Sequence, residues 1–90
     1  MFYIFREQSD NLRCVSKRKS WIKGERTESL IKILQGWGNY SVFHVVKASS
    51  QNRALIIAKN YQIDQSIEWR QNEEYIETII IDIGSENESE

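Results

Sequence analysis

The residues best suited to chemistry are cations gathered in one stretch, residues 13–26, around a tryptophan. Positive side chains displace the counterions condensed on a phosphate backbone, and an aromatic ring among them can stack on an unpaired base. We therefore expect this stretch to contact nucleic acid. The residues expected to make the contact are Arg13, Lys17, Arg18, Lys19, Trp21, Lys23 and Arg26.

The same stretch has two other interpretations. It could be a solvated loop whose Trp21 and Ile22 fold back onto the core, or it could dock on an acidic protein surface. Residues 1–60 contain 11 Lys or Arg and 4 Asp or Glu, a net charge of +7. Residues 61–90 contain 1 Arg and 9 Asp or Glu, a net charge of −8. The acidic end either adds only solubility or competes with an anionic partner for the basic stretch.

Side chains suited to catalysis or metal binding are sparse. The only histidine, His44, lies among apolar residues and is interpreted as a strand residue. The only cysteine, Cys14, excludes an internal disulfide and a cysteine-based metal site, and we interpret it as a small buried side chain. We interpret the late carboxylates as solvated, namely Glu73, Glu74, Glu77 and Asp82. No catalytic residue, metal or cofactor is expected, and we predict that the protein is not an enzyme.

Length and hydropathy limit the class of protein. A chain of 90 residues has the size of one domain. The apolar start at 2–5 is interrupted by charge and is too short for a signal peptide. No apolar run approaches the roughly 20 residues that span a membrane. We expect a cytoplasmic protein with no membrane partner.

Patterns on both sides of the basic stretch predict the elements that position it. Residues 2–7 and 12–16 are apolar enough for strands, and the turn formers at 8–11 join them as a hairpin. The rest of the basic stretch, residues 17–26, has no clear period, so we interpret it as a loop or as an irregular extension of the second strand. Thr27 is the predicted N-cap of a helix whose apolar stripe is Leu30, Ile33, Leu34 and Trp37.

The second half of the chain predicts a strand at 40–48 and a helix that begins after Ser49 or Ser50. The apolar stripe of this helix is Ala54, Ile57, Ala58 and Tyr61. A short strand at 66–70 and a long strand at 75–83 complete the predicted order ββαβαββ.

This order predicts a single α+β domain at 1–83 and a disordered acidic tail at 84–90. Strand–helix–strand connections favour parallel neighbours, and two helices with one apolar stripe each suit one covered face. We expect a two-layer sandwich with a mixed sheet of four to five strands and both helices on one face. Strands 2–7 and 40–48 are apolar on both sides, so either both faces are covered or one of them is an interface. An edge strand is another possible interface. The alternative function is therefore a protein–protein adaptor or inhibitor that acts as a homodimer.

Overall fold

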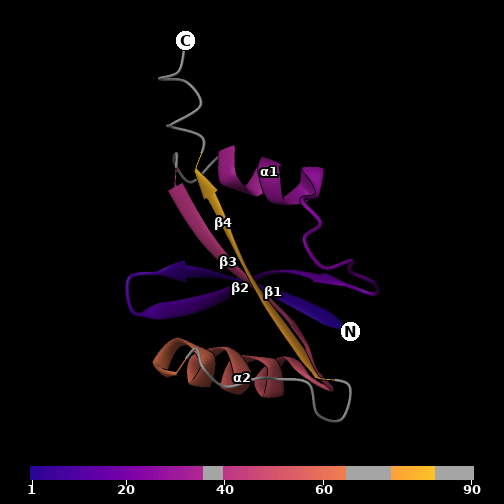
Figure 1. The fold of residues 1–90 in the computed structure, drawn as a ribbon, viewed down its shortest axis with the longest axis vertical. Coiled ribbons are helices and arrows are strands. Elements are labelled where there is room, and N and C mark those ends of the chain that lie inside the picture. The colour runs from indigo at the N-terminus through magenta and orange to yellow at the C-terminus, as the bar shows by residue number, and fades with distance from the viewer. Residues whose placement is uncertain (36–39, 65–73, 83–90) are drawn as a thin grey trace.

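The computed structural model describes residues 1–35, 40–64 and 74–82 (Figure 1). Its elements, in chain order, are β1 (Phe2–Gln8), β2 (Asn11–Arg18), α1 (Glu28–Gln35), β3 (Tyr40–Lys47), α2 (Gln51–Ile63) and β4 (Tyr75–Asp82). Each of these six elements confirms a predicted one. The strand predicted at 66–70 and the boundary of the predicted tail at residue 84 lie outside the described residues.

The four described strands form one sheet in the order β2-β1-β3-β4, and all neighbours are antiparallel. The prediction of a mixed sheet is therefore wrong. The reason is where the chain enters β4. Tyr75, the first residue of β4, pairs with Lys47, the last residue of β3, so the two strands run in opposite directions. Between them α2 lies across the end of the sheet and not back along β3 (Figure 1). No parallel crossover is made between these described strands.

The hairpin of β1 and β2 contains a β-bulge. Ile4 pairs with Ser16 and Phe5 pairs with Cys14, which leaves Val15 as the extra residue. Such a bulge bends the strand and increases its twist, and successive side chains on either side of it lie on opposite faces of the sheet. Val15 packs on one side of the sheet, and Cys14, which is half-buried, packs on the other.

Each face of the sheet carries its own hydrophobic cluster and its own helix. Leu30 of α1 packs on one face with Ile4, Phe43, Val45, Ile79 and Ile81. Ala54, Ile57 and Ala58 of α2 pack on the other face with Tyr3, Phe5 and Val46. The prediction of both helices on one face is wrong, because side chains alternate along a strand and β1 and β3 are apolar on both sides.

Local signals explain both helices. The backbone amide of Leu30 donates to Thr27 Oγ1 at 3.4 Å, and that of Arg53 donates to Ser50 Oγ at 3.1 Å, so both hydroxyls act as N-caps. In α2 the predicted stripe is buried at Ala54, Ile57 and Ala58, while Tyr61 is half-buried. In α1 only Leu30 of the predicted stripe has a described side chain, and it is fully buried.

Candidate functional site

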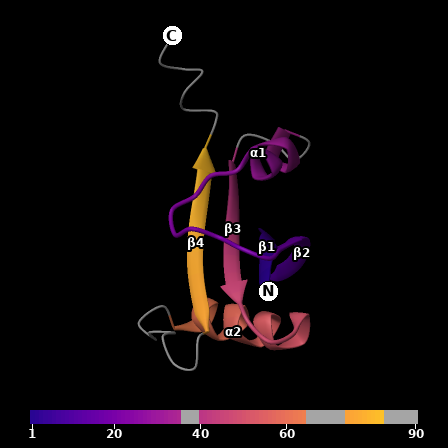
Figure 2. The ribbon, with the colours of Figure 1, turned by 90° about the vertical axis from the view of Figure 1, so that its right-hand side faces the viewer.

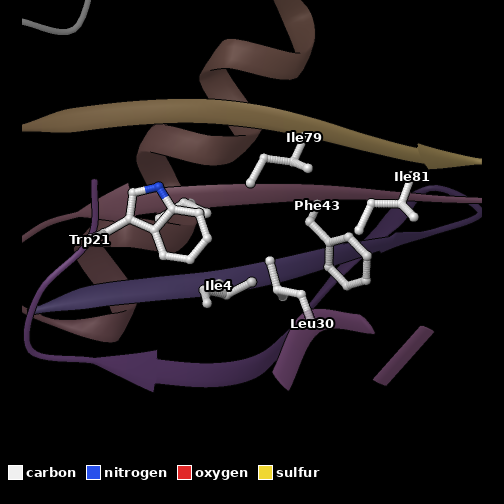
Figure 3. Close-up of a cluster of buried hydrophobic side chains, with 7 residues drawn as sticks. Ile4, Trp21, Leu30, Phe43, Ile79 and Ile81 are labelled. Atoms are coloured by element: carbon white, nitrogen blue, oxygen red, sulfur yellow. The ribbon is translucent and has the colours of Figure 1, made fainter. Parts of the chain in front are cut away.

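The basic stretch leaves β2 as a strap, which we define as residues 19–27. The strap crosses the face of the sheet that carries α1, from the β2 edge to β4, before it turns back into the helix (Figure 2). Trp21 lies in the cluster on this face with Ile4, Val45 and Ile79 (Figure 3). Trp21 is only 9% exposed, so its ring forms part of the core and offers no open face for a base to stack on. Ile22 differs, because it is 75% exposed.

A single carboxylate on β4 holds the strap to the sheet. Glu77 Oε1 accepts a hydrogen bond from Trp21 Nε1 at 2.8 Å and another from the Tyr75 hydroxyl at 2.9 Å. Its other oxygen accepts the backbone amide of Gly24. Burial of Tyr75, with its hydrogen bond to Glu77 and the charge of that carboxylate, raises the pKa of the Tyr75 hydroxyl above its usual 10.0. The hydroxyl therefore stays protonated and remains a donor.

A tight turn within the strap completes the anchoring. Glu25 donates its amide to the carbonyl of Ile22 at 2.8 Å, and Gly24 between them has a φ of 83°. Such a positive φ at the third position of a β-turn favours glycine. The Glu25 carboxylate accepts from the Ile22 amide at 3.1 Å and from Arg18 Nη1 at 3.3 Å. The Arg18 guanidinium also lies 5.3 Å from the centre of the Trp21 ring.

Of the predicted cations, Arg18 takes part in these anchoring contacts and is half-buried. The side chains at the other cationic positions are exposed, and they belong to β2, which is an edge strand, and to the strap: Arg13, Lys17, Lys19, Lys23 and Arg26. Opposed residues share a face, so Arg18, opposite Phe2, lies on the face that the strap crosses, and Arg13 lies on the same face. Lys17, opposite Tyr3, lies on the other face. The Trp21 ring lies in the core with the Arg18 guanidinium over it.

A second polar cluster lies beneath α2, around His44. His44 is 2% exposed, and both its ring nitrogens have partners. Nδ1 lies 2.9 Å from the Thr78 hydroxyl of β4, and Nε2 lies 2.8 Å from Oε1 of Glu7 on β1. Gln62 of α2 donates to the same Glu7 oxygen at 2.9 Å. The cluster therefore joins three strands and the helix.

Hydroxyl, imidazole and carboxylate in this order could serve a nucleophile, a base and a group that orients the base. Reaction would require substrate to reach the imidazole, but the ring is buried and Tyr61 of α2 lies against it at a centroid distance of 6.5 Å. The hydrogen bonds instead satisfy a polar side chain inside the core, which would otherwise be costly to bury. We assign the cluster a structural role.

Burial opposes the charged form of Glu7, but other effects outweigh it. The hydrogen bonds from His44 and Gln62, with the charge of His44 when protonated, lower the pKa of Glu7 below its usual 4.5. At the other end of the sheet, Glu74 binds Arg53 of α2 through two contacts of 2.7 and 2.9 Å. These contacts lower the pKa of Glu74. Carboxylates thus fix both ends of α2 to the sheet.

In residues 1–35, 40–64 and 74–82, no three His, Cys, Asp or Glu side chains are grouped as a metal ion would need. None of the helices described is both long enough and apolar enough to cross a membrane.

No protein-family model, curated protein or solved structure matches this chain.

Sequence reasoning missed the two groups that organise these clusters. We interpreted Glu77 as a solvated edge residue and His44 as an isolated strand residue. Glu77 accepts from Trp21, 56 positions away, and His44 meets Glu7, 37 positions away. Strand order and register bring these partners together, and no local pattern in one sequence indicates them. The only available signal was a histidine inside an apolar strand, since such a residue needs partners when buried.

The first prediction concerns the anchoring of the strap. Trp21→Phe removes the indole N–H that binds Glu77 and should lower the free energy of unfolding by about 1–3 kcal/mol, as expected for a bond to a charged group. Glu77→Gln weakens the same bond, so the double variant should lose less than the sum of the single losses in urea unfolding.

Asp82→Asn is the matched control, because Asp82 lies on the same strand five residues beyond Glu77. Its effect should add to that of Trp21→Phe, because distant sites are usually independent. Additive losses for Trp21→Phe and Glu77→Gln would contradict the assigned anchor.

The second prediction uses the lowered pKa of Glu7. A carboxyl whose pKa is lower in the folded state stabilises the fold above its unfolded pKa, and this contribution is lost as pH falls through the folded pKa. Glu7→Gln keeps an oxygen acceptor but removes the charge. Urea unfolding should therefore show a deficit in the variant at about pH 7 that shrinks towards about pH 3. An equal deficit at both pH values would exclude the charge as its cause.

Proposed function

We propose that this chain is a non-catalytic binding module that contacts nucleic acid through the cations of β2 and the strap. The proposal depends on one observation: exposed lysines and arginines follow each other along the edge strand β2 and the strap. Glu77 and Glu25 hold the turn of the strap in place. The residues proposed for the contact are Arg13, Lys17, Arg18, Lys19, Lys23 and Arg26, with Trp21 as the internal anchor of the strap.

Anchoring favours binding because a loop that is already ordered loses less conformational entropy on association. Glu77 and Glu25 hold the backbone between Lys19 and Arg26 through the contacts of Trp21, Ile22 and Gly24. The cations on this backbone are therefore presented at fixed spacing. Phosphates repeat at regular intervals along a strand, so a fixed row of cations engages several of them at once.

The burial of Trp21 changes the expected mode of contact. With its ring in the core, affinity comes mainly from the phosphate backbone and depends little on base sequence. Single strands are the proposed ligand, because the pI of 5.9 is low for a dedicated duplex binder. The reducing cytoplasm, where the half-buried Cys14 stays a thiol, is the proposed location.

The third prediction tests this surface with a charge reversal. In Lys19→Glu/Lys23→Glu, affinity for a fluorescent single-stranded oligonucleotide should fall roughly tenfold or more at low salt, because attraction to two phosphates is replaced by repulsion. The slope of log affinity against log salt should become shallower by about 0.7 for each phosphate that the variant no longer neutralises. Fluorescence anisotropy over a salt series measures both quantities.

Lys32→Glu/Lys59→Glu is the matched control, because it makes the same change of charge at exposed positions on α1 and α2. This control should bind nearly as the unaltered protein does. Two results would contradict the proposal: no binding by the unaltered protein at low salt, or equal losses in the two double variants.

A further inference from the structure

The two edges of the sheet differ in how well they are protected against pairing with another strand. On the β2 edge, the bulge at Val15 interrupts regular pairing, and exposed charges follow along the strand at Arg13 and Lys17. Bulges and charged side chains are the usual means by which proteins block an edge strand. The β2 edge is therefore a poor template for a further strand.

The β4 edge has no bulge, and its charged side chains are Glu77, which accepts from Trp21, and Asp82 at the end of the strand. Its eight residues pair with β3 in one unbroken register, from Tyr75 opposite Lys47 to Asp82 opposite Tyr40. Among the described residues, β4 pairs with no strand on its outer side. The outward N–H and C=O groups around Thr78, at the middle of this strand, can therefore pair with a strand from another molecule.

An apolar patch accompanies this open edge. Ile80 is 53% exposed and Tyr40 is 58% exposed. Their register with Val42 and Asp82 puts both on the face that carries α2, because opposed residues share a face. The helix packs at the other end of this face, near Val46 and Ile76, so the half around Ile80 is left uncovered. The strap lies on the opposite face and does not cover Ile80.

We propose that the partner on this edge is a second copy of the same chain, joined by antiparallel pairing of β4 with the partner's β4. On the face that carries α2, the strand presents Ile76, Thr78 and Ile80, which read the same in both directions. A twofold axis requires such self-complementarity, because each position meets its mirror position in the other copy. With the axis at Thr78, Ile80 lies opposite the partner's Ile76.

In this pairing the helices of the two copies do not face each other, and like charges on the two β4 strands are not directly opposed. Antiparallel pairing sets the uncovered end of one copy beside the end that carries α2 in the other, so the patch at Ile80 is placed next to the partner's helix-covered half. On the other face Glu77 lies opposite the partner's Ile79, not its Glu77, and Glu77 already accepts from Trp21. Glu74 lies opposite the partner's Asp82, but Arg53 binds Glu74 and offsets that repulsion.

The fourth prediction follows from the exposed isoleucine. Light scattering coupled to size exclusion should give twice the mass of one chain for the unaltered protein, and the mass of one chain for Ile80→Lys. Ile31→Lys on α1 is the matched control, because Ile31 is 38% exposed and its helix packs on the opposite face of the sheet. It should remain a dimer. A monomeric unaltered protein, or a dimer that survives Ile80→Lys, would overturn the proposal.

The register can be tested without relying on Ile80→Lys. In a Cys14→Ser background, Ile76→Cys and Ile80→Cys are made as separate proteins and mixed under mild oxidation. Residues opposite each other across two antiparallel strands are close enough for a disulfide, so the mixture should give a covalent dimer containing one chain of each. Neither protein alone should cross-link to the same extent. Equal cross-linking of each variant with itself would contradict the twofold axis at Thr78.

Discussion

The carboxylate of Glu77 is the contact on which the arrangement of the basic stretch depends. It accepts from Trp21, Tyr75 and Gly24 at once, and so joins the edge strand β4 to a loop that begins at the opposite edge of the sheet. A charged oxygen held by several donors is more strongly bound than a neutral one. The strap is thereby drawn across the apolar face, and Trp21 closes the cluster beneath it.

The core explains why the tryptophan is buried while its cationic neighbours are not. Ile4, Phe43 and Val45 leave an apolar surface on the face away from α2, and the described part of α1 covers it with Leu30. An indole ring buries a large apolar area and keeps its N–H satisfied through Glu77. Lysine has no comparable gain from burial. The strap thus places its tryptophan in the core and its lysines at the surface.

Much of the local structure could be predicted from the sequence, because it depends on signals between near neighbours. Thr27 and Ser50 cap the helices, and alternating apolar residues define β1 and β3. Strand direction and helix placement could not be predicted in this way. They depend on how α2 crosses the sheet and on pairings such as Tyr75 with Lys47, which no local pattern encodes. The exposed cations were found from composition, whereas the anchoring role of Glu77 depends on tertiary contacts.

The bulge at Val15 determines which cationic side chain packs on the indole ring of Trp21. In a regular hairpin, Val15 would face Ile4 and Lys17 would stand opposite Phe2. With the extra residue, Arg18 takes that place and lies over Trp21 while binding Glu25. A planar guanidinium can stack on a ring and donate from its edge at once, which a tetrahedral ammonium cannot do. Because of this one inserted residue, Arg18 packs over the indole ring in place of Lys17, and the Lys17 side chain is exposed to solvent.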